Sequence, residues 1–303
     1  MRLLKRRADL NYQQLSENLR TLSDKHGCEL LSIGRSVLGR ELWTIRLGWG
    51  ARSVYINGAH HACEWLTASL LLAFIQAYLE AREAASPLWG IDIGEASSRA
   101  SLWITPMVNP DGVALAKEGL DAIPQQYHST LLKWNYGNPN FREWKANIRG
   151  VDLNRQYRAD WLKAYESSPK TPAPKYFAGE HPESEPEAKA VADFTRKLKP
   201  EFVIAYHSQG EVIYWNYRRK APPEARRIAK ELSRLTGYAL VGHNPREAGY
   251  GGYKDWFISH FHRPGFTIEI GRGMNPLPLA QFNSIWQKNA PLLANLANYV
   301  LNL

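Results

Sequence analysis

The pattern of apolar and polar positions divides the chain into one amphipathic helix, a hairpin and then alternating strands and helices. From residue 11 to residue 26, apolar side chains recur at intervals of three and four, which predicts the first helix. Two runs of strand character follow, Glu29–Val37 and Glu41–Leu47, and Gly39 between them predicts a hairpin turn. The segment Glu64–Glu83 is apolar nearly all round, so we expect a helix that packs against a sheet.

The same alternation continues to the end of the chain. Strand character marks six further segments, Ser53–Ile56, Ser101–Val108, Glu201–His207, Glu211–Trp215, Tyr238–Val241 and Gly265–Ile270. Helices are expected before Leu198, over Pro223–Leu235 and over Leu279–Leu301. This order predicts an α/β fold, a mixed and mostly parallel twisted sheet with helices on both faces, in a single domain over residues 1–303. Residues 1–10 are expected to form a basic, disordered N-terminus.

Three local signals refine this prediction. The segment Asn109-Pro110-Asp111-Gly112 is a strong turn signal at the end of a strand. Ser184 and Glu187 predict a capping box at the start of the helix that ends at Leu198. Residues 112–176 show little periodicity, and a loop of that length is usually functional or a sign of misassigned elements.

Composition narrows the class of protein. With 303 residues, 44% hydrophobic and 22% charged, the chain can bury a substantial core and does not have the composition of a disordered protein. The formal charge of +9 favours acidic partners. Only two cysteines, Cys28 and Cys63, are present, so neither a disulfide framework nor a thiolate metal cluster is expected.

No segment has the pattern of an export signal or a membrane span. The basic N-terminus lacks the apolar core of a signal peptide. The most apolar stretch, Leu66–Leu79, is too short and too interrupted to cross a bilayer. We therefore expect no membrane insertion and a location in the cytoplasm, or in association with a spore or cell wall.

A candidate metal site begins where the strand at Ser53–Ile56 gives way to a helix. His61 and Glu64 lie three residues apart there, and a nitrogen ligand with an oxygen ligand suits Zn²⁺. The pair alone is weak evidence, because it also fits a helix that begins with a favourable glutamate in its first turn.

Two residues of later strands can complete the site. Sheets of this class gather functional groups at the carboxyl ends of their strands, where His207 and Glu269 are expected. A catalytic zinc takes three protein ligands and one water, which His61, Glu64 and His207 can supply. Glu269 is then the candidate general base. The alternatives are a core histidine at 207 and an ion-paired Glu269, but an idle carboxylate in an apolar strand is costly.

Six motifs occur in order along the chain. They are Gly58-x-x-His61-x-x-Glu64-Trp65, Asn109-Pro110-Asp111-Gly112, Gly150-Val151-Asp152-Leu153-Asn154-Arg155, Ser184-Glu185-Pro186-Glu187, His207-Ser208 and Thr267-Ile268-Glu269. Together they resemble the zinc metallocarboxypeptidases of the carboxypeptidase A type, from about Tyr12 to the C-terminus. The resemblance implies a carboxypeptidase-like domain with an eight-stranded mixed sheet, one Zn²⁺ on His61, Glu64 and His207, and Glu269 as general base.

The resemblance also implies roles for residues around the metal. Asp152 would accept a hydrogen bond from the His61 ring and fix its tautomer, and is otherwise only a turn residue. Asn154 and Arg155 would bind a substrate carboxylate, which suits the planar guanidinium group. Without a substrate they would be an ordinary surface pair.

Two functions of the family fall on less suitable residues here. At the place of the arginine that holds the oxyanion, this chain has Lys145, with Arg149 nearby as the alternative. The mobile tyrosine that contacts substrate is matched by Tyr250, a few residues from the expected place. Both assignments stay open at this point.

The specificity region departs from the digestive enzymes. Lys254 occupies the position that selects the residue after the cleaved bond, and Arg272 adds a second cation, so an anionic group is expected there. The segments around His61, His207 and Glu269 look like those of the bacterial γ-D-glutamyl-diaminopimelate peptidases of this family. Glu211 could then bind the ammonium group of meso-diaminopimelate while Lys254 or Arg272 binds its carboxylate.

The sequence thus predicts a zinc-dependent peptidase that hydrolyses γ-D-glutamyl-diaminopimelate bonds of peptidoglycan peptides, using a metal-activated water and Glu269. The alternative is a carboxypeptidase that removes acidic or other C-terminal residues from ordinary peptides. A rival of another class is a non-catalytic module that binds wall polymer, which would need a missing ligand or base. Nucleic acid is not expected, because the basic residues are scattered and not interleaved with aromatic residues.

Overall fold

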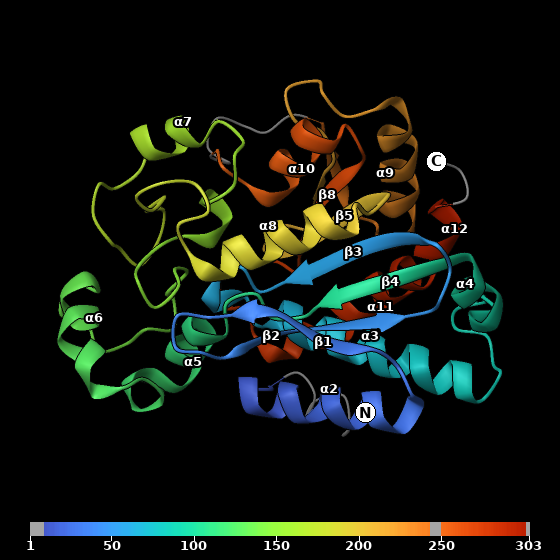
Figure 1. The fold of residues 1–303 in the computed structure, drawn as a ribbon, viewed down its shortest axis with the longest axis horizontal. Coiled ribbons are helices and arrows are strands. Elements are labelled where there is room, and N and C mark those ends of the chain that lie inside the picture. Colours follow the sequence, from blue (N-terminus) through green and yellow to red (C-terminus); the bar gives the residue numbers. More distant parts are fainter. Residues whose placement is uncertain (1–8, 243–249, 301–303) are drawn as a thin grey trace.

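This computed structural model describes residues 9–242 and 250–300. Within these residues, eight strands form one mixed sheet (Figure 1). The strands are β1 (Leu30–Arg35), β2 (Glu41–Leu47), β3 (Arg52–Gly58), β4 (Ala100–Thr105), β5 (Phe202–Ser208), β6 (Val212–Tyr214), β7 (Ala239–Val241) and β8 (Gly265–Ile270). Their order is β1-β2-β4-β3-β5-β8-β6-β7. Most of the N-terminal arm predicted over residues 1–10 lies outside the described residues.

The centre of the sheet is parallel and its edges are mixed. β4, β3, β5 and β8 are neighbours that all run in one direction. β1 and β2 form the predicted antiparallel hairpin, and β2 is antiparallel to β4. At the other edge β6 is antiparallel to β8 and parallel to β7. The predicted mixed, mostly parallel sheet is confirmed, and its parallel strands end at one common edge.

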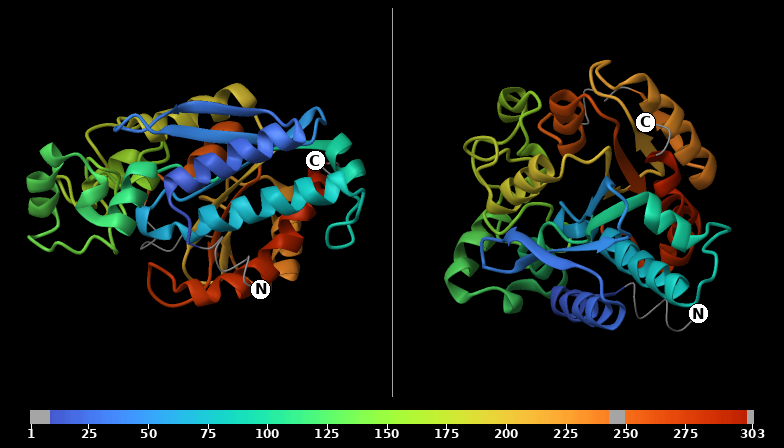
Figure 2. Two further views of the ribbon diagram at one scale, coloured as in Figure 1. Left: turned by 90° about the horizontal axis from the view of Figure 1, so that it is seen from below. Right: turned by 45° about the vertical axis from the view of Figure 1, so that its right-hand side comes forward.

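Helices cover both faces of the sheet (Figures 1 and 2). They are α2 (Tyr12–His26), α3 (Leu66–Glu83), α4 (Ile93–Arg99), α5 (Pro110–Glu118), α6 (His128–Trp134), α7 (Trp161–Glu166), α8 (Pro186–Leu198), α9 (Pro223–Thr236), α10 (Tyr253–Phe261), α11 (Phe282–Ala294) and α12 (Leu296–Val300). Short 3₁₀ turns include η1 (Ala62–Glu64) and η4 (Leu153–Arg155). Figure 2 shows α2 and α3 side by side on one face of the sheet.

Strand residues alternate between two cores, as expected for a sheet that is covered on both faces. In β3, Val54 and Ile56 pack in the larger core, which also contains residues of α2, α3 and α11. Tyr55 between them packs in the second core, with residues of α8 and α10. The continuous apolar character of these strands follows from this double burial.

The apolar helix predicted over Glu64–Glu83 is the central helix of the larger core. The segment Ala62–Glu83 is long and apolar enough to cross a bilayer, so the expectation that it is too short was wrong. However, 89% of its most apolar window is buried inside the protein. A core helix that packs against a sheet accounts for its composition.

Two local predictions were wrong in instructive ways. Asn109-Pro110-Asp111-Gly112 starts helix α5, because the Asn109 side chain accepts a hydrogen bond from Gly112 N at 3.0 Å and Pro110 occupies the first turn. Ser184 and Glu187 form no capping box, and Glu185 precedes α8 without a side-chain cap.

Glu187 is instead a buried structural carboxylate. Val37 N donates to its Oε1 at 3.2 Å, and Asn147 Nδ2 donates to its Oε2 at 3.2 Å. These contacts join the β1–β2 hairpin to the segment that precedes the candidate site. Helices α4, α6, α7 and α10 were not predicted, and three of them are too short to show a clear period.

We predict that Glu187→Gln makes stability less sensitive to alkaline pH. Burial raises the pKa of Glu187 to about 8, and Asp111 and Glu185 add to the shift. Because the folded pKa lies above the ordinary 4.5, this carboxyl stabilises the fold below pH 4.5, and its contribution is lost as the pH rises to about 8. Relative to wild type, the variant should gain about 2–5 kcal/mol between pH 4.5 and pH 8.5.

Urea unfolding of both proteins at the two pH values measures this difference. The exposed Glu180→Gln serves as the control and should follow wild type at each pH. An unfolding free energy of Glu187→Gln that differs from wild type by the same amount at every pH would contradict the assignment.

Candidate metal centre and active site

Three candidate ligands meet at the carboxyl edge of β3 and β5. His61 follows β3, Glu64 ends η1, and His207 lies near the end of β5, which pairs in parallel with β3. Thr67 fixes the turn between them, because its Oγ1 donates to Glu64 O and accepts from Ala59 N, both at 2.8 Å. Glu64 and His207 are each only 1% exposed.

The geometry of these side chains fits a metal ion. The two Nδ1 atoms of His61 and His207 face each other at 3.3 Å. Glu64 presents Oε1 to His61 Nδ1 at 2.8 Å and Oε2 to His207 Nδ1 at 3.0 Å. Ligand atoms about 2.0–2.1 Å from a tetrahedral zinc lie about 3.3–3.4 Å apart, which matches the nitrogen separation. Within the described residues, His61, Glu64 and His207 form a group whose ligand atoms all lie within 4.8 Å of one another, close enough to hold a cation.

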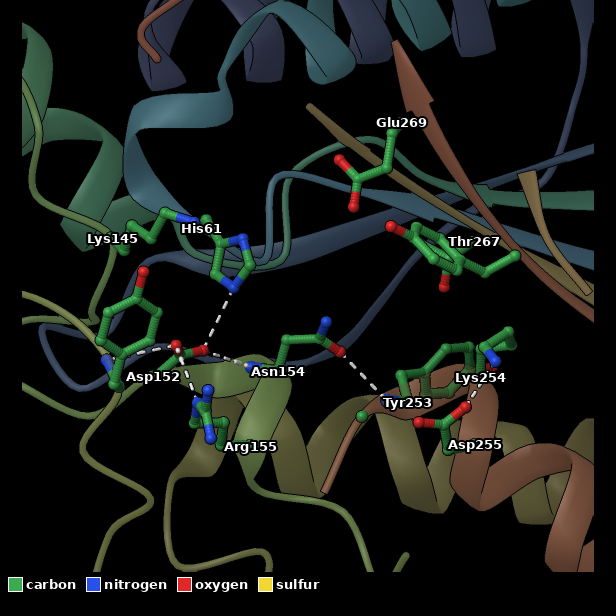
Figure 3. A pocket seen from close by; sticks show the side chains of 13 residues that line it. His61, Lys145, Asp152, Asn154, Arg155, Tyr253, Lys254, Asp255, Thr267 and Glu269 are labelled. Carbon is green, nitrogen blue, oxygen red and sulfur yellow. Dashed lines mark hydrogen bonds and ion pairs between the residues drawn. The ribbon is translucent and has the colours of Figure 1, made fainter. Parts of the chain in front are cut away.

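Asp152 holds the outer nitrogen of His61. His61 Nε2 lies 3.1 Å from Asp152 Oδ1 (Figure 3). This contact leaves Nδ1 directed at Glu64. Asp152 also accepts hydrogen bonds from Asn154 N and Tyr176 N, at 3.1 and 3.3 Å. Burial opposes its charge, but His61 and then Arg155 hold the pKa of Asp152 below its ordinary value. A carboxylate in this position fixes the histidine tautomer that metal binding requires.

Glu269 lies beside His207 on the neighbouring strand. The two residues are directly paired in the parallel register of β5 and β8, so their side chains share one face of the sheet. The carboxylate lines a pocket of about 230 Å³ together with His61 and Lys145 (Figure 3). Burial, and then the charge of Glu64, raise the pKa of Glu269 to about 8. Glu269 can therefore both accept and return a proton near neutral pH.

The structure separates the two candidates for the oxyanion. Lys145 Nζ lies 3.8 Å from Glu64 Oε1 and lines the pocket. Arg149 has a side chain that is 53% exposed, and its Nη1 lies 3.8 Å from Glu185 Oε2. Only Lys145 of the two has its charge at the centre of the candidate site.

Asn154 and Arg155 line the same pocket, at the end of η4. Asn154 Oδ1 accepts from Tyr253 N at 3.0 Å, which ties η4 to the start of α10. Arg155 Nη1 donates to Ser168 Oγ at 3.3 Å, and Arg155 Nε lies 3.7 Å from Asp152. Both side chains thus line the pocket, and their role in binding a substrate stays a prediction.

Lys254 lines the far end of the pocket, where it forms an ion pair with Asp255. Its side chain is 4% exposed, and its Nζ lies 2.5 Å from Asp255 Oδ1 and donates to Asn216 O at 2.7 Å. Figure 3 shows Lys254 and Asp255 next to each other, away from Lys145. This end of the pocket therefore presents both a cation and an anion.

The predicted partnership of Glu211 with a substrate ammonium group needs correction. Glu211 is held by Arg272, at 2.7 Å, and by Lys288, and none of the three lines the pocket. Glu211 and Arg272 therefore lie outside the pocket lining, and neither is placed to bind a substrate group in that pocket.

Tyr250 also lies outside the pocket lining. Its ring contacts the Lys163 and Arg218 side chains, with cation-to-centroid distances of 5.7 and 6.0 Å. Three other tyrosines line the pocket, Tyr176, Tyr214 and Tyr253, and the sequence analysis named none of them as a site residue. Tyr176 lies beside Lys145 and Arg155. Arg155 and Lys145 lie over its ring, at 5.1 and 5.9 Å from the centroid. Its only sequence signal was its place in the irregular region of residues 112–176.

The neighbours of the ligand histidine point away from the metal centre. His60 Nε2 lies 2.8 Å from Tyr157 Oη, in agreement with the interpretation that His61 and not His60 is the ligand. Cys63 is 2% exposed and belongs to the larger core, where burial raises the pKa of its thiol. Cys63 is not part of the group of side chains that converge to hold a cation.

We predict that Asp152→Asn weakens zinc binding by about 10–100-fold, because an amide fixes the His61 ring less firmly than a carboxylate does. The dissociation constant is measured by competition with a chromogenic chelator. Asp193→Asn, a substitution on the exposed face of α8, is the control and should bind zinc as wild type does. Unchanged affinity in Asp152→Asn would refute the role of Asp152.

Comparisons with known proteins agree with this arrangement. The model of the zinc carboxypeptidase family matches residues 15–292. The chain is 38% identical over 288 residues to gamma-D-glutamyl-L-diamino acid endopeptidase 1 of Lysinibacillus sphaericus, covering 95% of this chain and 72% of that protein. It is also 38% identical over 263 residues to the uncharacterized protein YqgT of Bacillus subtilis, with 86% and 69% coverage.

Solved structures share the fold at low sequence identity. The crystal structure of thrombin activatable fibrinolysis inhibitor superimposes with a TM-score of 0.76 at 20% identity, covering 96% of this chain and 74% of that one. Murein-tripeptide amidase MpaA from Escherichia coli O157 gives 0.56 at 19% identity, with 88% and 91% coverage. The family match spans nearly the whole chain and includes every candidate ligand and the candidate base, so this protein belongs to the zinc carboxypeptidase family of metallopeptidases.

Proposed function

We propose that this metallopeptidase hydrolyses the bond between γ-D-glutamate and a diamino acid in peptidoglycan peptides, with one Zn²⁺ held by His61, Glu64 and His207. The observation that carries the substrate class is the 38% identity, over 95% of the chain, to a relative named for that bond. The proposal includes the location expected from the sequence, in the cytoplasm or in association with a spore or cell wall.

The charges that line the pocket support this substrate. A diamino acid such as meso-diaminopimelate has an ammonium group and a carboxylate at the end of its side chain. Lys254 and Asp255, at the end of the pocket, offer one charge of each sign within 2.5 Å of each other. We therefore assign to Lys254 the carboxylate of the diamino acid side chain and to Asp255 its ammonium group, in place of Glu211. Arg155 is the candidate for a further carboxylate of the substrate.

Three side chains, those of Glu269, Lys145 and Asp152, have separate roles in the proposed hydrolysis. When bound, zinc would polarise the scissile carbonyl and lower the pKa of a water molecule. Glu269 takes the proton of the attacking water and later gives it to the leaving amine. Lys145 supplies positive charge for the oxyanion, and burial does not neutralise it, because Glu64 and Asp152 raise its pKa. Asp152 keeps His61 in the orientation that binds metal.

We expect Glu269→Gln to bind zinc but to lose hydrolysis by about 10²–10⁴-fold, because an amide cannot accept the proton. Zinc content by elemental analysis and single-turnover peptide cleavage measure the two properties separately. Glu180→Gln, an exposed change, controls for handling of the protein. Near-normal turnover in Glu269→Gln would remove Glu269 from the mechanism.

A substrate panel separates the proposed function from the carboxypeptidase alternative. L-Ala-γ-D-Glu-meso-diaminopimelate should be cleaved with a higher kcat/KM than peptides that end in Glu, Lys or Phe. The physical reason is that only the first substrate places opposite charges at Lys254 and Asp255. A preference for C-terminal Phe would refute the role of Lys254, and a preference for Glu would favour the alternative enzyme.

A further inference from the structure

The loop after β8 reaches back over the metal centre through one side chain. In residues 271–278, Arg272, Gly273 and Met274 are exposed, and Met274 is 85% exposed. Asn275, next in the chain, is partly buried and directed at the carboxyl edge of β5. The loop is therefore exposed over residues 272–274 and turns inward at Asn275.

Asn275 is bound on both sides of its amide group. Its Nδ2 donates to Ser208 O at 2.6 Å and lies within hydrogen-bond distance of Glu64 Oε1, at 3.2 Å. Its Oδ1 accepts from Ser208 Oγ at 2.8 Å. The bond to the Ser208 carbonyl fixes which end of the amide faces Glu64, since a carbonyl oxygen only accepts and therefore requires the amide nitrogen.

The same segment supplies a donor to the other oxygen of Glu64. Ser208 N donates to Glu64 Oε2 at 3.2 Å. Each carboxylate oxygen thus faces one imidazole nitrogen and one neutral N–H donor, on Asn275 or Ser208. This pattern limits rotation of the carboxylate about its last bond, because either oxygen would lose a donor if the group turned.

We propose that Asn275 is a positioning residue that orients the Glu64 carboxylate for zinc. A buried carboxylate needs hydrogen-bond donors when no metal is present, and the neutral donors of Asn275 and Ser208 supply them without adding to the positive charge of Lys145, which lies 3.8 Å from Glu64 Oε1. Arginine or lysine in place of Asn275 would satisfy the carboxylate equally well but would compete with the metal. The inference rests on the zinc site proposed above and concerns none of the substrate assignments.

A purely structural role for Asn275 is the competing explanation, and other contacts already fill that role. Leu277 is buried and belongs to the larger core. Gln281 accepts from Arg272 N at 3.0 Å and donates to Arg272 O at 2.7 Å. Gly210 N donates to Gly271 O at 2.8 Å. The loop is therefore held at both ends without Asn275.

The test compares zinc affinity in four proteins. Asn275→Leu keeps the approximate volume and removes the donor, and Asn275→Ser covers the case in which the larger side chain disturbs folding. Gln281→Ala is the matched control, since it loosens the same loop without touching Glu64. Competition with a chromogenic chelator gives the zinc dissociation constants, and thermal unfolding of the metal-free proteins reports on the fold.

We expect both Asn275 variants to bind zinc at least about tenfold more weakly than wild type, as for other side chains that orient a ligand. Gln281→Ala should bind as wild type does. Zinc affinity within twofold of wild type in a folded Asn275 variant would overturn the proposal. Equal weakening in Gln281→Ala would also overturn it, because the position of the loop and not the amide would then be responsible. If wild type itself bound no zinc, the proposed metal site would fail first.

Discussion

The parallel pairing of β3, β5 and β8 is the constraint on which the site depends. It brings three chain segments that are distant in sequence, those of His61, His207 and Glu269, to one edge of the sheet. The pairing of His207 with Glu269 in register places the candidate base beside a candidate ligand. A shift of one residue in β8 would turn Glu269 to the opposite face of the sheet and leave the pocket without a base.

Burial then decides how these side chains must be supported. Glu64 and His207 have almost no contact with solvent, so their polar atoms depend on partners from the protein or on a metal ion. Asp152 orients one histidine, and Ser208 and Asn275 reach the carboxylate. The candidate ligands are therefore supported by Ser208 at the end of β5 and by Asp152 and Asn275 in irregular segments that only the fold brings near.

The substrate pocket follows the same division between strands and loops. The chemistry lies on strand ends, while the residues that face a substrate come from η4, from the segment at Tyr176 and from the start of α10. The Lys254–Asp255 pair gives the far end of the pocket both signs of charge. Glu211 and Arg272 form a pair outside it, so a charged residue at a given position in the sequence does not by itself face the pocket.

The sequence by itself determined the α/β class, the strands of the central sheet and the family, because apolar periodicity and the order of motifs can be read along the chain. It also indicated the candidate ligands His61, Glu64 and His207, which the fold then brings together. It could not determine whether Lys145 or Arg149 lies at the site, since both belong to one irregular segment whose path is set by contacts with Pro174 and Glu185. It also could not reveal Tyr176 or Asn275, which no motif marks. Their contacts with Asp152 and Glu64 join positions 24 and 211 residues apart, and only tertiary packing creates such contacts.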